Sequence, residues 1–344
     1  MELGAFSIVE PRPDIVDAGA GSRYDELLRL VETAERSGLS SFWVGEHHFQ
    51  SGGMCPSPPV LLAAAGQRTS AIRLGSLVCV LPFHRAVDIA EEYSMLDQLL
   101  HGRLNFGVGS GYVPLELEGF GVSPDSKRER FERTLAEVRA AFAGSPVGVE
   151  GGGVVRINVR SPQFPHPPIW VSVQRRESVP HVARAGLSIA LLPYATFRDP
   201  SDLGAAIREY RAELSPGAPG RISVALPIYV GDDPHRANRA LDRHLQSRAA
   251  TLGGYYEGSV RRAPATVTAA DVERAGFSVF GSPDEVRTRL HEFERLGVDE
   301  VLGMFDLGDL PAHEVVGSMR RVVLARAALA SMAPTAWIRN VPAR

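Results

Sequence analysis

Eight short apolar runs alternate with longer segments of helical periodicity along almost the whole chain. The runs, which we interpret as strands, cover 3–10, 40–49, 72–82, 103–111, 167–173, 187–193, 222–232 and 298–305. The helical segments that follow them cover 24–38, 58–69, 86–101, 127–144, 177–186, 199–214, 233–250 and 311–330, and one more helix is expected at 282–297. Eight strands that each lead into a helix predict an α/β fold, the (β/α)8 TIM barrel.

An open, doubly wound sheet is the alternative to the barrel. We favour the barrel because the strand count reaches eight and no first strand-to-helix turn carries a dinucleotide fingerprint. We expect one domain over 1–344, with insertions at about 112–126, 144–165 and 251–279. The second contains a small hairpin and the third is predicted to be irregular. Barrel enzymes carry their chemistry at the carboxyl ends of the strands, so the insertions are expected at that face.

Composition excludes several classes of function. A net charge of −3 over 344 residues does not indicate a nucleic-acid or membrane-surface partner. No apolar run is long enough to span a bilayer, and the first residues lack the pattern of a secretion signal, so we expect a cytoplasmic protein. The two cysteines, Cys55 and Cys79, have no metal-like spacing, which fits a reducing compartment.

The second predicted strand ends in Glu46, His47 and His48. Because neighbouring side chains of a strand face opposite ways, Glu46 and His48 share one face and His47 takes the other. This spacing does not suit two histidine ligands on one metal ion, so we predict no metal site. His47 is the candidate acid/base catalyst. Glu46 either orients His47 or pairs elsewhere, and His48 is either functional or a satisfied core residue.

Two further strand ends carry polar or glycine-rich sequence. Strand four ends in GVGSG, with Gly109, Ser110 and Gly111, and strand five ends in Gln174, Arg175 and Arg176 before a helix. Glycines allow a ligand close to the backbone, and arginines at a helix N-terminus are unfavourable unless an anion is bound there. The two ends predict a phosphate site. The alternatives are glycines that only turn the chain and a surface ion pair to Glu177. Strand three, GSLVCVLP, is either a flat wall for a planar ligand or plain core.

Several of these segments together resemble the bacterial luciferase-like flavin-dependent monooxygenases. They are WVGEHHF, LGSLVCVLPFHRAVDIAEEYSMLDQLLHGRLNFGVGSGY, ELEGFG, PPIWVSV with ARAG, and FGSPDEV with GVD, so the resemblance covers most of the chain. The run from AEE through LDQLLHGR to GVGSG is its most specific part.

The resemblance implies a TIM barrel that uses reduced FMN and O2 through a C4a-hydroperoxyflavin. The product would be an oxygenated small organic compound, including secondary-metabolite intermediates of polyketide type in antibiotic biosynthesis. A separate flavin reductase would supply the reduced flavin, and a homodimer would be the active unit. Two alternatives on the same fold are an F420-dependent dehydrogenase or reductase and a non-catalytic luciferase-like subunit.

Site residues follow from the resemblance by position. His47 falls where luciferase has its acid/base histidine, with Glu46 beside it. Positions that contact the FMN phosphate in luciferase correspond to Ser110, Gln174, Arg175 and Ser178, with Gly109 and Gly111 alongside. Leu77 and Val78 fall at a bulge beneath the flavin ring, where the family often has a non-proline cis peptide.

The chain departs from the luciferase pattern after strand four, where Gly109-Ser110 replace a cysteine and an arginine. We expect Arg175 to take over the role of that arginine, and Gly109 to leave room for a substrate bulkier than a fatty aldehyde. Two insertions are expected to act as lids over the flavin. The first insertion supplies Tyr112, Glu116 and Glu118, and the third supplies Tyr255, Tyr256 and Phe277.

Overall fold

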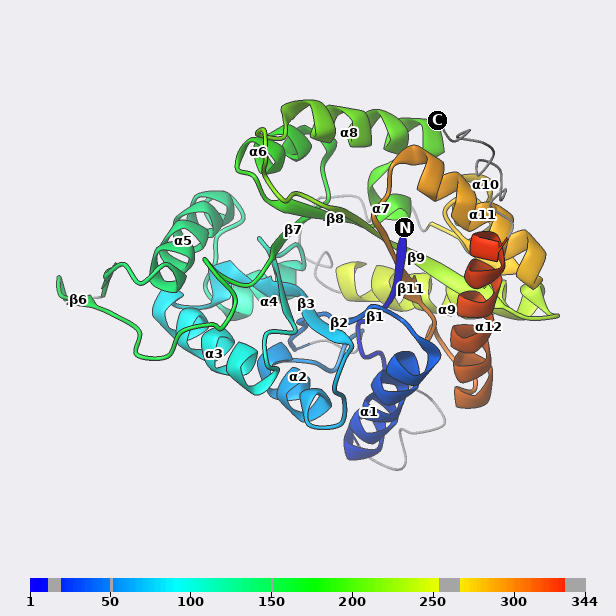
Figure 1. The fold of residues 1–344 in the computed structure, drawn as a ribbon, viewed down its shortest axis with the longest axis horizontal. Helices are drawn as coiled ribbons and strands as arrows, with labels where there is room; N and C mark the ends of the chain where they lie inside the picture. Colours follow the sequence, from blue (N-terminus) through cyan, green and yellow to red (C-terminus); the bar gives the residue numbers. More distant parts are fainter. Residues whose placement is uncertain (12–19, 50–51, 150, 254–266, 332–344) are drawn as a thin grey trace, which may run out of the picture.

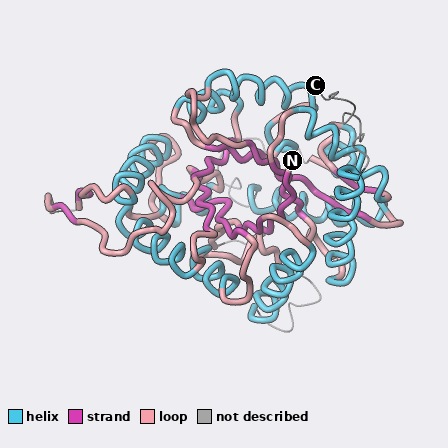
Figure 2. Tube along the Cα trace, in the orientation of Figure 1, coloured by secondary structure: helices cyan, strands magenta, loops and turns pink. Residues whose placement is uncertain are grey.

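Eight parallel strands close into a barrel in the computed structural model, which describes residues 1–11, 20–49, 52–149, 151–253 and 267–331. In order around the barrel they are β1 (Glu2–Ser7), β2 (Ser41–Val44), β3 (Arg73–Val80), β4 (Leu104–Gly109), β7 (Ile169–Val173), β8 (Ser188–Leu191), β9 (Ile222–Val230) and β11 (Glu300–Met304). Pairing of β8 with β9 closes the ring that Figure 2 shows, which confirms the TIM barrel over the open sheet.

Helices surround the ring of strands (Figure 1). They are α1 (Ala20–Ser37), α2 (Pro58–Gly66), α3 (Ala86–Leu99), α5 (Lys127–Phe142), α6 (Val179–Arg184), α8 (Pro200–Glu213), α9 (Pro234–Gly253), α11 (Pro283–Leu296) and α12 (Ala312–Ser331). The expected ranges agree with these bounds to within a few residues, because apolar periodicity and stop signals such as Gly38 and Gly297 are local features of the sequence.

The first insertion contains a short helix that the sequence does not indicate, α4 (Pro114–Gly119). The hairpin predicted in the second insertion is confirmed as β5 (Val147–Gly148) and β6 (Val154–Val155), and it projects from the barrel in Figure 1. The prediction that 251–279 is irregular is wrong at its end. Helix α10 (Ala269–Arg274) begins at a capping box on Thr268, and β10 (Val279–Gly281) extends the sheet beside β9.

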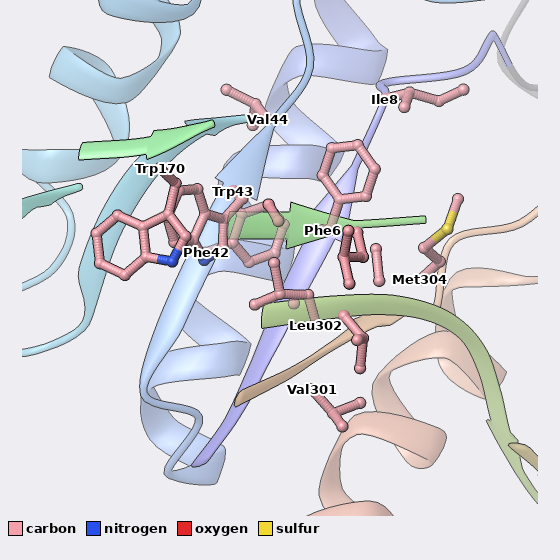
Figure 3. Close-up of a cluster of buried hydrophobic side chains, with 14 of the residues drawn as sticks. Phe6, Ile8, Phe42, Trp43, Val44, Trp170, Val301, Leu302 and Met304 are labelled. Atoms are coloured by element: carbon pink, nitrogen blue, oxygen red, sulfur yellow. The ribbon is translucent and has the colours of Figure 1, made fainter. Parts of the chain in front are cut away.

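Aromatic side chains fill the barrel at the level of β2 and β7 (Figure 3). Trp43 and Trp170 meet edge to face with 5.2 Å between their ring centroids, and all four residues of β2 are buried. Gly75 on the neighbouring strand is required by this packing, because a Cβ there would lie 2.4 Å from the Trp43 ring. The barrel is therefore a filled core, and ligands can reach only its ends.

Strand β3 is irregular at the point where it faces β4. The register shifts between Ser76 and Cys79, and the Leu77–Val78 peptide is cis, as the family resemblance implies. Leu77 and Val78 are partly exposed, whereas the residues on either side of them are buried. This places two apolar side chains at the open, carboxyl end of a strand that is otherwise core.

No helix within the described residues is long and apolar enough to cross a membrane.

Candidate active site

His47 lies just beyond the carboxyl end of β2 and is held by a carboxylate from the first insertion. Its Nδ1 is 2.9 Å from Oε1 of Glu116 on α4, and the same oxygen accepts a hydrogen bond from the backbone N–H of His48. His47 is 8% exposed and Glu116 is 2% exposed. A neutral imidazole held this way carries its proton on Nδ1, so Nε2 is the atom that can accept or release a proton.

The backbone around His47 leaves its ring little freedom. Its N–H donates to the carbonyl of Cys55, and a Cβ on Gly53 would lie 2.9 Å from ring atoms of His47. On another side the ring meets Tyr112 edge to face, with 6.2 Å between the ring centroids. The predicted candidate base is therefore positioned by neighbours that the sequence does not associate with it.

Glu46 pairs elsewhere, which is the second of the two alternatives that the sequence leaves open for it. Its Oε1 lies 3.0 Å from Nε2 of His48 and 2.8 Å from Nε2 of His84, and its Oε2 accepts from the N–H of Val80. Burial opposes ionisation, but hydrogen bonds from His48 and His84 outweigh it and lower the pKa of Glu46 to about 2. Glu46 thus ties the end of β2 to β3 as a buried carboxylate, and a direct catalytic role stays a prediction.

Glu46, Cys79 and His84 also bring ligand atoms within 4.8 Å of one another, which is the arrangement of a possible metal site. In this structure Glu46 and His84 are already hydrogen-bonded to each other, and burial holds the pKa of the Cys79 thiol well above its usual value. These contacts satisfy the carboxylate and imidazole within the protein, so we assign the cluster a structural role.

The first insertion is docked on the barrel by an aromatic cluster as well as by Glu116. Phe83 and Phe120 stack with 4.4 Å between their centroids, and the His48 ring meets Phe120 at 4.7 Å. His48 is therefore packed and hydrogen-bonded, as expected for a satisfied core residue. Of the expected lid residues, Glu116 lies inward against His47, whereas Glu118 is exposed.

The glycines of β4 are explained by close packing with β3. A Cβ on Gly107 would lie 2.0 Å from the carbonyl oxygen of Ser76, and one on Gly109 would lie 2.7 Å from Cγ2 of Val78. The expectation that Gly109 leaves room for a bulky substrate is wrong, because the side chain of Val78 occupies that space. Gly111 has a φ of 75°, which L side chains rarely adopt, so it turns the chain.

A lysine side chain lies against Gly111, and the charge of Arg175 acts on it. Lys127, the single lysine of the chain, donates from Nζ to the carbonyl of Gly111 at 2.7 Å. Burial and then the charge of Arg175, which follows β7, lower the pKa of Lys127. Among the described residues, neither has a carboxylate within ion-pair distance. Both cationic groups thus lack a carboxylate partner in this part of the structure, and Lys127 is one that the sequence does not reveal.

Gln174 and Ser178, two other predicted phosphate residues, lie close to Arg175 along the chain. Gln174 is exposed at the end of β7, and Ser178 ends the 3-10 turn Arg176–Ser178, whose N-cap is Arg175. Arg176 does not join Lys127 and Arg175, because it forms an ion pair with Asp202 at 2.8 Å. Its partner is therefore Asp202 and not Glu177, the partner named in the alternative interpretation. Tyr255 and Tyr256 lie outside the described residues, and Phe277 is buried in the core.

Polar residues that the sequence does not indicate also lie at this face. Glu10 follows β1, Tyr194 is in α7 (Pro193–Thr196) after β8, and His244 and Arg248 are on α9 after β9. They come from strands separated by long stretches of chain, so no local spacing could indicate them. A lone histidine or tyrosine within a helical sequence gives no signal of its own.

Comparison with known proteins agrees with this geometry. The family model described as luciferase-like monooxygenase matches residues 1–300. The chain belongs to the luciferase-like monooxygenase family. Within that family it is 35% identical over 147 residues to limonene 1,2-monooxygenase of Rhodococcus erythropolis, which covers 43% of this chain and 37% of the relative. It is 28% identical over 178 residues to the oxygenase component of the flavin-dependent trigonelline monooxygenase of Acinetobacter baylyi, covering 49% of each.

Solved structures of two monooxygenases resemble the barrel over nearly its whole length. Monooxygenase RslO1 from Streptomyces bottropensis has a TM-score of 0.82 at 26% identity and covers 96% of this chain and 100% of its own. The oxygenating constituent of 3,6-diketocamphane monooxygenase of Pseudomonas putida, solved with FMN, has a TM-score of 0.76 at 19% identity, covering 95% and 98%. The chain spans about half or less of the length of the two curated relatives named above.

Proposed function

We propose that this protein is the oxygenase component of a flavin-dependent monooxygenase that uses reduced FMN and O2. The observation that carries the proposal is one juxtaposition. An anion-binding pair, Lys127 and Arg175, and a partly exposed apolar floor, Leu77 and Val78, lie at the same barrel mouth as the positioned His47. Phosphate, planar ring and acid/base group of a flavin site would correspond to these three parts.

The residues present fit FMN chemically. A phosphate monoester needs cations and N–H donors, which Lys127, Arg175 and the backbone at Ser110 and Gly111 offer. An isoalloxazine ring needs a flat apolar surface, and Leu77 and Val78 provide one beside Gly109. Bound reduced FMN would supply the activation of O2. His47 would hold or release a proton through Nε2, and the docked first insertion would exclude water.

Partners and substrate follow from the same proposal. The name of the trigonelline relative includes the words "oxygenase component", which supports a separate reductase as the source of reduced flavin. Of the two solved structures, the Streptomyces monooxygenase has the higher TM-score, and a further relative is named 4-hydroxyprotoasukamycin monooxygenase. We therefore propose a small organic substrate of secondary-metabolite type, oxygenated by a cytoplasmic homodimer.

The test is anaerobic mixing of the protein with reduced FMN, followed by oxygenated buffer and rapid-scanning absorbance. We expect an oxygenated flavin species that persists far longer on the protein than in free solution, because the enclosed site excludes water. Oxidation to FMN as fast as in free solution would contradict the proposal. It would direct attention to F420, since an F420-dependent secondary alcohol dehydrogenase shares the fold with a TM-score of 0.73 at 15% identity.

The anion-binding pair gives a second expected result. Lys127→Met and Arg175→Ala should each weaken FMN binding about 10- to 100-fold, the effect of losing one charged hydrogen bond to phosphate. Riboflavin, which lacks the phosphate, should bind all variants equally. Arg176→Ala is the matched control, because this neighbouring arginine pairs with Asp202 and should leave FMN affinity unchanged. Equal FMN affinity in wild type and Arg175→Ala would remove Arg175 from the site. Fluorescence titration of both flavins measures these affinities.

A further inference from the structure

A second group of polar side chains gathers at the mouth of the barrel and takes no part in the proposed flavin contacts. Tyr112 follows β4, Tyr194 follows β8, Glu10 follows β1, and His244 and Arg248 lie on the helix after β9. Carboxyl ends of strands from different parts of the barrel thus send polar groups to one place. Tyr112 also contacts the His47 ring, so the group begins next to the candidate acid/base catalyst.

One part of this group is a buried hydrogen-bonded chain. Oε1 of Glu10 lies 2.7 Å from Nδ1 of His244, and Nε2 of His244 lies 3.2 Å from the hydroxyl of Tyr194. His244 is 1% exposed and Glu10 is 5% exposed, and both line a narrow crevice with Ile8, Met304, Asp306 and Leu307. In the tautomer whose Nδ1 proton is directed at the carboxylate, Nε2 of the His244 imidazole accepts from the Tyr194 hydroxyl. These three hydrogen-bonded side chains can therefore receive one proton through the Tyr194 hydroxyl.

The other part is a cation. The Arg248 guanidinium lies over the ring of Tyr112, 5.6 Å from its centroid, and Arg248 is partly buried. Burial acts to lower the pKa of Arg248, but electrostatic interactions with Tyr112, Tyr194 and the Glu10 carboxylate outweigh it and the pKa is raised. Within the described part of the chain no carboxylate lies within ion-pair distance of Arg248. Its charge is therefore not neutralised by a carboxylate of the described residues.

We propose that Arg248 and Tyr194 bind the acidic hydroxyl of a phenolic or enolic substrate and that the Glu10–His244 pair takes its proton. The substrate O–H bond breaks and its proton passes to the Tyr194 oxygen, while the Tyr194 proton passes to Nε2 of His244. The imidazolium is then stabilised by the Glu10 carboxylate, and the substrate oxyanion by Arg248. A carboxylic acid, already ionised at neutral pH, would need the cation but not the proton acceptor.

This assignment rests on the proposed function only in calling the ligand a substrate. Ionising a phenol or enol raises the electron density at the neighbouring ring or α carbon. That carbon is the position which an electrophilic oxygen donor attacks. The subsite thus narrows the substrate class to compounds that carry such a hydroxyl group next to the carbon to be oxygenated.

The probe for this site is 4-nitrophenol, whose phenolate absorbs visible light, titrated with pH on the full-length protein without flavin and with FMN. Wild type should bind the phenolate at least about tenfold more tightly than neutral 4-nitroanisole of similar shape, and the pKa of the bound phenol should be lowered. Arg248→Gln should lose both effects, and Tyr194→Phe should weaken phenolate binding. Arg239→Gln is the matched control, because Arg239 is an exposed arginine of the same helix.

Three results would overturn the assignment. The first is that wild type fails to bind 4-nitrophenolate. The second is that Arg248→Gln binds 4-nitrophenolate as tightly as wild type does. The third is that wild type binds 4-nitrobenzoate as tightly as 4-nitrophenolate. The last would reduce the site to a general anion site. The two proposals fail separately. Arg248-dependent phenolate binding with no stabilised oxygenated flavin would refute the monooxygenase and leave the subsite, and the reverse pattern would refute only the subsite.

Discussion

Replacing His47 with glutamine should leave FMN bound but lower turnover about 10²- to 10⁴-fold, the usual contribution of a positioned general acid or base. Glutamine keeps polar atoms near Oε1 of Glu116 but cannot exchange a proton. FMN affinity should stay close to that of wild type, because the anion-binding pair is on the other side of β4 from His47. A loss of turnover without a loss of FMN affinity distinguishes a catalytic residue from a structural one.

Glu116→Gln is the companion variant to His47→Gln. It should reduce turnover about tenfold, because the amide still accepts from the His48 N–H but no longer stabilises a positively charged His47. Glu118→Gln, on the same helix but exposed, is the matched control and should have no effect. Before a substrate is known, the decay of the oxygenated flavin against pH can be followed. The plot of the decay rate against pH should show an inflection in wild type that is absent from His47→Gln. Identical pH profiles for wild type and His47→Gln would exclude His47 as the proton-exchanging group.

The barrel itself could be predicted from the sequence because its signals are local. Each strand is a short apolar run and each helix repeats every three or four residues, so the alternation is visible without knowing any contact. His47 could be predicted in the same way, since a strand end in a barrel is a place where chemistry is expected. The cis peptide at Leu77–Val78 follows from family resemblance alone.

The neighbours of these residues could not be predicted, because a closed barrel brings distant segments together. Glu116 is 69 residues from His47, and His244 is 234 residues from Glu10. The error at Gly109 has the same origin. A glycine next to a strand end indicates space only if nothing else fills it, and in this barrel the bulge in β3 directs Val78 into that space. Local sequence cannot report which side chain a neighbouring strand supplies.

Removing the Glu46 carboxylate is expected to destabilise the fold strongly. Glu46→Ala leaves the Val80 N–H without its acceptor and deprives His48 and His84 of their shared carboxylate, at 3% exposure. Breaking a buried pair by removing one partner costs about 3–5 kcal/mol of unfolding free energy. Glu46→Gln keeps an acceptor for Val80 and should lose less. Glu91→Ala, an exposed glutamate of α3, is the control and should stay within about 0.5 kcal/mol of wild type.

The dependence on pH gives this prediction a sign that can be checked. The pKa of Glu46 is lowered from 4.5 to about 2, so its contribution is fully present above pH 4.5 and is lost as the pH falls through about 2. By linkage the contribution amounts to about 3 kcal/mol. The pKa of His84 is raised from 6.5, with burial opposing the rise and the hydrogen bond and charge of Glu46 causing it. The stabilisation that His84 contributes is therefore present below pH 6.5 and is lost as the pH rises through the raised pKa of His84.

Both shifts describe the same ion pair, so their contributions are one quantity and must not be added. Chemical denaturation of wild type and Glu46→Ala from pH 3 to pH 8 should therefore show the largest difference in unfolding free energy near pH 5 to 6. The difference should narrow toward both ends of the range. A difference that is constant with pH would mean that Glu46 stabilises the fold through its packing volume and not through its charge. In that case the contact between the ends of β2 and β3 would not depend on ionisation.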